Sequence, residues 1–275
     1  MLICDPHRFV FVHIPKCAGT TVRARIRRFD SYDGYFERPK THPGLGRVDY
    51  GHIPLAMLAR AFPEVLQKLR DYTSFAVIRD PLDRFGSSLR QTLHFYERVY
   101  PTEMSRTELH DAVRRMIDRL EESPDWARYD LTFFQRQVDF VDLDGERITD
   151  RLYPLARVGQ MLEDIGDLAG VPLGGEEKRN RDLSFRSRAL VRPAYALNAF
   201  LWRHAPAGLH ASLKRFAVPL LTHRDSATKR LGITDFAEVQ DFVDRHYAED
   251  AALHASLVAG PAQPTASPRE QPRAD

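Results

Sequence analysis

The chain has 275 residues, of which 43% are hydrophobic, and this is enough to bury the core of one large domain. Charged residues make up 28% of the chain, yet the formal net charge is only +2. The balance excludes a protein that binds nucleic acid through a strongly basic surface. The longest apolar runs have the length of a strand, so we expect neither a signal peptide nor a membrane-spanning helix.

The first predicted elements are a strand, a tight loop and a helix. The run FVFVHI (Phe9–Ile14) is apolar throughout, as in a strand that is buried on both faces of a parallel sheet. After the loop, Val22, Ile26 and Phe29 recur at helical spacing, with arginines between them. This order predicts an α/β fold with a central parallel sheet.

The same order returns about sixty residues later in the stretch YTSFAVIRDPLDRFGSSLRQTLHFY. Phe75–Ile78 is predicted to be a second buried strand, and Asp80 followed by Pro81 predicts the N-cap and first turn of a helix. The two strand-to-helix junctions are the most ordered features of the sequence.

The rest of the sequence predicts further helices and a short strand, but few candidate functional residues. Further helices are expected at Glu108–Leu120, Tyr129–Val141, Val158–Ala169 (closed by Gly170) and Phe236–Leu257, with a short strand at Arg151–Leu155 and a loop at Gly174–Arg192. The proline-rich end has no apolar pattern. We therefore predict one domain over residues 1–258 and a disordered tail over residues 259–275.

The first loop, in HIPKCAGTT (residues 13–21), has the residues of an anion site. A helix start presents unpaired backbone N–H groups and the positive end of the helix dipole. Gly19 allows close approach, Thr20 and Thr21 add hydroxyl groups, and Lys16 adds a positive charge. The pattern predicts a phosphate site, although its lysine precedes the glycine and so differs from the Walker loop of nucleoside triphosphatases.

The second junction supplies a matching pair of residues. Arg79 stands at the carboxyl end of its strand, where ligands bind in open α/β sheets, and Ser87 follows in the next helix. Arginine can bind a phosphate through two parallel N–H groups, and serine can add one hydrogen bond. Together the two loops predict a nucleotide with phosphates at two separate places.

HIPKCAGTT and VIRDPLDRFGSS resemble the 5′-phosphosulfate and 3′-phosphate motifs of sulfotransferases that use 3′-phosphoadenosine 5′-phosphosulfate (PAPS). The likeness is to the branch of heparan sulfate 2-O-sulfotransferases and many bacterial members. It extends over most of residues 8–257, through a similar middle region at residues 133–171 and a similar closing helix. It implies a P-loop-kinase-like three-layer fold.

Carried over residue by residue, the resemblance assigns Lys16 to the 5′-phosphosulfate, both as a binding and as a catalytic residue. The residues around Lys16 in this motif are Ala18, Gly19, Thr20 and Thr21, and the 3′-phosphate is assigned to Arg79 and Ser87. The loop at Lys178–Asn180 is a candidate for a third contact to the nucleotide. Lysine, arginine and backbone N–H groups supply the positive field, so we expect no metal.

The resemblance also suggests a base for the acceptor hydroxyl. YGHIP (residues 50–54) resembles the element that provides the catalytic histidine in this branch, which assigns the role to His52. A neutral imidazole suits such a proton transfer. The second histidine of some members is Tyr50 here, His42 is a second candidate for the base, and His13 is interpreted as packing or loop support.

The sequence therefore predicts transfer of a sulfuryl group from PAPS to an acceptor hydroxyl, and the resemblance favours a carbohydrate or glycoconjugate. Arginines 23, 27, 38 and 90 are candidates for an anionic acceptor groove. The two cysteines, Cys4 and Cys17, favour a reducing compartment. With the predicted lack of a membrane anchor, the chain resembles bacterial cytoplasmic members of the family rather than the Golgi-resident ones. Two alternatives stay open: a kinase-type phosphotransferase, and a nucleotide-binding module that has lost catalysis.

Overall fold

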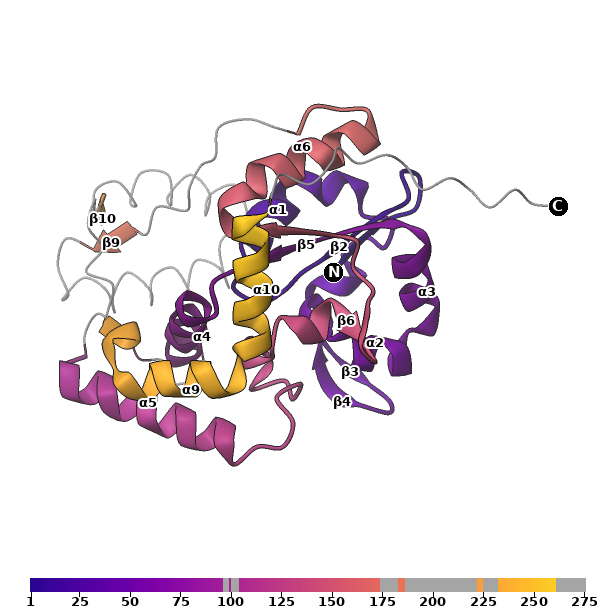
Figure 1. Cartoon of the computed structure of the whole chain (residues 1–275). Coiled ribbons are helices and arrows are strands. Elements are labelled where there is room, and N and C mark those ends of the chain that lie inside the picture. Colours follow the sequence, from indigo (N-terminus) through magenta and orange to yellow (C-terminus); the bar gives the residue numbers. More distant parts are fainter. Residues whose placement is uncertain (96–98, 100–103, 174–182, 186–221, 225–231, 261–275) are drawn as a thin grey trace, which may run out of the picture. The chain divides into compact units, whose positions relative to one another are not determined.

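The computed structural model describes residues 1–95, 99, 104–173, 183–185, 222–224 and 232–260 (Figure 1). The chain divides into two compact units, one of Met1–Glu176 with Ile233–Asp275 and the other of Glu177–Gly232. In the second unit, β9 (Leu183–Phe185) pairs antiparallel with β10 (Thr222–Arg224). Most of the predicted loop at 174–192 and of the predicted tail at 259–275 lies outside the described residues. Both predicted phosphate loops belong to the first unit.

A mostly parallel sheet of four strands forms the centre of the first unit (Figure 1). Its strands are, in spatial order, β1 (Leu2–Cys4), β2 (Phe9–Val12), β5 (Thr73–Ile78) and β8 (Arg151–Pro154). β1 is antiparallel to β2, whereas β2, β5 and β8 are parallel to one another. The three parallel strands therefore end at the same edge of the sheet, and the predicted loops follow two of them.

Helices flank this sheet and join its strands, so the architecture is mixed α/β. They are α1 (Gly19–Ile26), α2 (Leu55–Ala61), α3 (Pro63–Asp71), α4 (Pro81–Phe95), α5 (Arg106–Glu121), α6 (Val158–Ala169), α9 (Ala237–His246) and α10 (Ala248–Ala259). α6 has the predicted bounds and ends at Gly170 in the left-handed region. Asp80 caps α4 as predicted, because its carboxylate accepts from the Asp83 N–H at 2.9 Å. Among the described helices, none has the length and apolar character needed to cross a membrane.

The helix predicted at Tyr129–Val141 is wrong. This segment forms two 3₁₀ turns, η5 (Thr132–Phe134) and η6 (Val138–Phe140), joined by irregular chain. Its backbone groups bond to side chains of other elements: the Phe133 carbonyl accepts from Arg84 and Ser88, and the Phe134 carbonyl accepts from Tyr247. Tertiary partners thus replace the bonds that a helix would have made.

The structure divides the predicted terminal helix, Phe236–Leu257, into two helices. α9 ends and α10 begins around Tyr247, which has non-helical backbone angles and points its hydroxyl into the core.

The prediction lacked α2, α3, the hairpin of β3 (Pro39–His42) and β4 (Gly46–Asp49), and the hairpin of β6 (Asp142–Leu143) and β7 (Glu146–Arg147). These short elements lie between the sheet strands in the sequence.

An ion pair is buried between α4 and α10. Arg84 and Asp250 have 1% and 0% exposed side chains, and their Nη2 and Oδ2 atoms are 3.6 Å apart. The Asp250 carboxylate also accepts from the Gln137 and Val138 N–H groups, at 2.9 and 3.0 Å. Burial raises the pKa of Asp250, against the opposing effects of Arg84 and of these N–H groups. α10 therefore holds the irregular segment between η5 and η6 in place.

Asp250→Asn should destabilise the fold strongly, because it leaves the Arg84 charge buried without a counter-charge. Breaking a buried pair in this way costs about 3–5 kcal/mol. The neighbouring Glu249→Gln is the control, since the Glu249 side chain is 68% exposed and its change should cost less than about 0.5 kcal/mol. Urea unfolding of both variants measures the difference, and equal stabilities would contradict the structural role of Asp250.

Candidate functional site

The loop between β2 and α1 has the geometry of an anion site. Lys16 and Ala18 both have positive φ, at 66° and 59°, so the backbone turns sharply before Gly19. The Ala18 carbonyl accepts from the Thr21 and Val22 N–H groups and so begins the helix. In the described part of the chain, the N–H groups of Ala18, Gly19 and Thr20 have no backbone acceptor. They are thus available to a ligand at the start of α1.

The two predicted loops contact each other. The Arg79 Nη1 atom donates to the Lys16 carbonyl at 3.1 Å, and the Lys16 Nζ atom donates to the Gln91 Oε1 atom at the same distance. Lys16 is thus held on α4, the helix that begins after Arg79. The structure thus brings together two predicted site residues that lie 63 residues apart in the sequence.

Ser87 lies on the face of α4 that the first loop contacts. Asp83, Ser87 and Gln91 follow each other at intervals of four residues, which places them on one side of a helix. Gln91 bonds to Lys16, and the Asp83 carboxylate is 4.0 Å from the Arg79 guanidinium. The Arg79 Nε atom is buried, with no hydrogen-bond partner among the described residues. Arg79 therefore keeps one donor that no described residue uses.

Gln137, which was not predicted from the sequence, joins the two loops through its side-chain amide. Its side chain is fully buried, with Oε1 accepting from the Arg79 N–H at 2.9 Å and Nε2 donating to the Arg79 carbonyl at 2.8 Å. The Cys17 Sγ atom also contacts Oε1, at 3.2 Å. Burial raises the pKa of Cys17 to about 12, so Cys17 remains a thiol that can donate this bond. Gln137 thus fixes the backbone of both loops.

His52 is held by a carboxylate. Its Nδ1 atom is 2.8 Å from the Asp49 Oδ2 atom, and the other Asp49 oxygen accepts from the Gly51 N–H at 3.0 Å. Burial alone would raise the pKa of Asp49, but the hydrogen bond and charge of His52 and the Gly51 N–H lower it overall. Because ionised Asp49 can only accept, this hydrogen bond places a proton on His52 Nδ1, so in the neutral imidazole it is Nε2 that carries the lone pair.

The structure also places His52 beside the first loop. The rings of His52 and His13 have centroids 4.3 Å apart, and His13 directly precedes the residues of that loop. The His52 ring also makes a T-shaped contact with Phe133, at a centroid distance of 6.0 Å, and the Phe133 carbonyl accepts from Arg84 and Ser88 of α4. A base candidate, the Lys16 loop and the Arg79 junction therefore form one connected group of contacts.

A model described as the sulfotransferase family matches residues 1–147 of this chain, slightly more than half of its 275 residues. The chain belongs to the sulfotransferase family. Comparisons with curated proteins and with solved structures found no match. The matched region of the sulfotransferase contains both loops, Asp49, His52 and Gln137, and family membership supports sulfuryl transfer to a hydroxyl acceptor as its reaction.

Other predicted residues lie apart from this group. His42 ends β3, where its Nδ1 atom accepts from the Gly44 N–H at 3.1 Å and its ring meets Phe62. Arg23 was a candidate for the acceptor groove, but its side chain is buried against Glu37 at 2.9 Å and donates to the Met1 and Phe36 carbonyls. That role for Arg23 is therefore wrong. Lys178–Asn180 lie outside the described residues.

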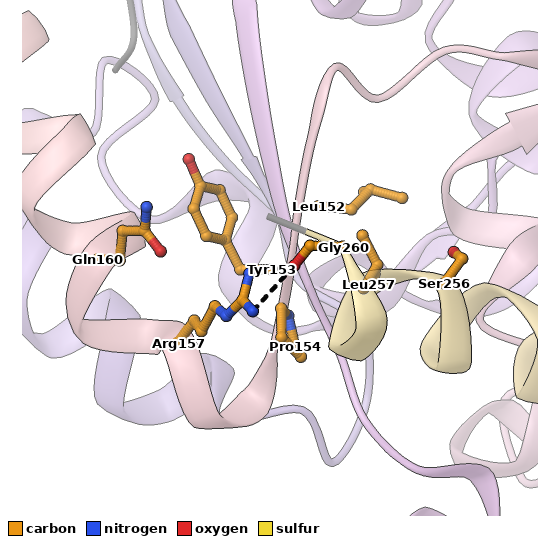
Figure 2. A pocket seen from close by; sticks show the side chains of 8 residues that line it. All are labelled: Leu152, Tyr153, Pro154, Arg157, Gln160, Ser256, Leu257 and Gly260. Carbon is orange, nitrogen blue, oxygen red and sulfur yellow. Dashed lines mark hydrogen bonds between the residues drawn. The ribbon is translucent and has the colours of Figure 1, made fainter. Parts of the chain in front are cut away.

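The structure has a cavity of about 130 Å³ at the carboxyl end of β8 (Figure 2). Figure 2 shows it between the start of α6 and the end of α10, and the Arg157 Nη2 atom donates to the Gly260 carbonyl at 3.1 Å. Its lining residues are Leu152, Tyr153, Pro154, Arg157, Gln160, Ser256, Leu257 and Gly260. None of the predicted site residues lines it, so this cavity lies outside the predicted site.

Gly19 is required by the position of the His13 ring. A Cβ atom on Gly19 would lie 1.8 Å from the His13 Cδ2 and Nε2 atoms, far closer than any side chain can pack. The ring is confined on its other sides by Phe11 and His52, at centroid distances of 6.0 and 4.3 Å. The glycine therefore makes room for a histidine at the start of α1.

Gly19→Ala should cost about 1–3 kcal/mol of stability, as overpacking does. The same change should cost much less in a His13→Ala background, where the clash is gone, and this cycle isolates the contact. Gly159→Ala is the control, because nothing lies within 4 Å of its added Cβ and alanine is a better helix former than glycine, so this change should not destabilise the protein. Urea unfolding of the four variants provides the values, and an equal cost of Gly19→Ala in both backgrounds would refute the assigned contact.

Proposed function

We propose that this sulfotransferase transfers the sulfuryl group of PAPS to an acceptor hydroxyl, with His52 as the base. The observation that carries the proposal is the direct contact between the two loops, in which Arg79 donates to the Lys16 carbonyl and Lys16 reaches Gln91 on α4. A nucleotide with phosphate groups at its 3′ and 5′ ends matches two neighbouring positive sites of this kind. We also propose that the sheet belongs to the P-loop-kinase-like three-layer fold.

The residues present fit the donor nucleotide. Arg79 has a buried Nε atom without a partner in the described part of the structure, and it would bind the 3′-phosphate together with Ser87. The N–H groups of Ala18, Gly19 and Thr20 and the hydroxyls of Thr20 and Thr21 would surround the 5′ end. PAPS supplies an activated sulfuryl group, whose leaving group is the 5′-phosphate of the bisphosphate nucleotide.

Lys16 and His52 would act on opposite sides of the transferred group. The Lys16 ammonium would stabilise the negative charge that grows on the leaving oxygen. The Nε2 atom of His52 would accept the hydroxyl proton while Asp49 holds the ring and stabilises the imidazolium that forms. The Nδ1 atom of His42 accepts from the Gly44 N–H, and His42 has no such carboxylate partner among the described residues, so the geometry favours His52.

We propose a carbohydrate as acceptor on the basis of the resemblance to 2-O-sulfotransferases. The hairpin β3–β4 leads directly into Asp49 and His52 and carries two cations on aromatic rings. Lys40 lies over Tyr35 at 3.4 Å, and Arg47 lies over Tyr129 at 4.3 Å. Cations and ring faces of this kind suit an anionic sugar. The two free, buried cysteines agree with a reducing compartment, and we propose the cytoplasm.

The nucleotide assignment is tested by the melting temperature with 3′-phosphoadenosine 5′-phosphate, AMP and magnesium ATP. At about a hundred times its dissociation constant, the bisphosphate should add about 2.7 kcal/mol of stability. Arg79→Gln should weaken bisphosphate binding by about 10–100-fold and leave AMP binding unchanged, because only the bisphosphate has the 3′-phosphate. Arg70→Gln, which removes an exposed ion pair with Glu146, is the control and should change the affinity for neither nucleotide. Stabilisation by magnesium ATP alone would instead support a kinase-type enzyme.

The base is tested by turnover with sulfuryl-labelled PAPS and a panel of hydroxyl acceptors. His52→Ala should lower turnover by about 10²–10⁴-fold without weakening bisphosphate binding, as expected for loss of a general base. Asp49→Asn should also lower turnover, since its amide stabilises an imidazolium less well. His42→Ala should stay near the wild-type rate. If His42→Ala lost activity and His52→Ala kept it, the two assignments would be reversed.

A further inference from the structure

His13 lies between the donor loop and the base. Its ring stacks on Phe11 at 6.0 Å, meets the His52 ring at 4.3 Å, and places its Nε2 edge directly over Gly19. Gly19 is the first residue of α1, where the unpaired N–H groups of the loop converge. A group that moves from this loop to a hydroxyl at His52 must therefore pass close to His13.

The two nitrogens of His13 have different surroundings. Nδ1 is buried and has no hydrogen-bond partner in the part of the chain that the structure describes. A buried N–H without an acceptor is rarer than a buried lone pair without a donor. This favours the neutral tautomer with its proton on Nε2, beside Gly19. Burial and then the neighbouring His52 also lower the pKa of His13 well below its ordinary value, which agrees with a neutral ring.

We propose that His13 is a second catalytic histidine, whose Nε2–H donates a hydrogen bond to an oxygen of the sulfuryl group as this group passes from the Lys16 loop to the acceptor. The proposal rests on the proposed function and adds a residue to its site. In the transfer, the acceptor oxygen forms its bond to sulfur and loses its proton to His52 Nε2. The bond between sulfur and the 5′-phosphate oxygen breaks, and its electron pair stays on the bisphosphate. His13 keeps its proton throughout.

The surroundings of the two histidines separate their roles. His52 has a carboxylate on Nδ1, which suits a base that becomes charged, whereas the structure gives Nδ1 of His13 no counter-charge. Two imidazolium rings at a centroid distance of 4.3 Å would repel each other. A neutral His13 therefore donates a hydrogen bond without opposing the protonation of His52.

The test compares the affinity for PAPS with that for 3′-phosphoadenosine 5′-phosphate, because only PAPS carries the sulfuryl group. Calorimetry on wild type, His13→Asn and His13→Gln needs no knowledge of the acceptor. His13→Asn should weaken PAPS binding about 10-fold and leave bisphosphate binding unchanged. His13→Gln should restore PAPS binding to within about 3-fold of wild type, since its amide nitrogen can occupy the place of Nε2. The control is His110, a half-buried histidine on α5 that bonds to Glu238; its changes to Asn and Gln should leave the binding of both nucleotides unchanged.

The outcomes separate the two proposals. If wild type binds neither nucleotide, the proposed function fails and this inference fails with it. If wild type binds both and His13→Asn weakens both equally or neither, His13 has only a packing role and the inference alone is overturned. Should the variants not fold, ¹⁵N spectra of the wild-type histidines decide, with a shift of the His13 Nε2 signal upon addition of PAPS, but not of bisphosphate, supporting the inference. An Nε2 signal that responds identically to both ligands would overturn it.

Discussion

The site depends on one buried amide, that of Gln137. Its oxygen accepts from the Arg79 N–H and the Cys17 thiol, and its nitrogen donates to the Arg79 carbonyl. A glutamate could accept these bonds but could not donate to the carbonyl, and its charge would oppose an anion in the loops. Leucine would leave the buried Arg79 N–H and carbonyl unsatisfied, which costs more than the bonds contribute. A neutral amide meets all three requirements, since it accepts hydrogen bonds, donates one and carries no charge.

The amide is held by charges further inside the protein. Asp250 accepts from the N–H groups of Gln137 and Val138, and Arg84 balances its charge. Tyr247 bonds to the Phe134 carbonyl and lies 5.2 Å below the Arg84 guanidinium. Residues of α4, the irregular segment and α10 therefore form one network beneath both loops. The region matched by the family model, which contains both loops and His52, is held by a helix that lies outside that match.

The sequence predicted what is encoded locally. Buried strands and the Asp80 cap have short-range signals, and the structure confirms them. Asp49, three residues before His52, was close enough to be found from spacing alone but was missed. Gln137 had no local signal, because its partners Arg79 and Cys17 lie 58 and 120 residues away. Partners far away in the sequence also explain why the helix predicted at Tyr129–Val141 is wrong. There, long-range hydrogen bonds replace the helical ones that local periodicity favoured.

The position of Asp250 in the sequence has a consequence for synthesis. It lies 113 residues after Gln137, so ribosomes complete the sheet strands, both loops and His52 long before the carboxylate that fixes them exists. Domains generally fold as units, and synthesis proceeds at about 5–20 residues per second. For several seconds the nascent chain thus contains both predicted phosphate loops without the carboxylate that holds Gln137. Completion of α10 supplies Asp250, so a chain that ends before this helix has every predicted catalytic residue but lacks the carboxylate that holds Gln137.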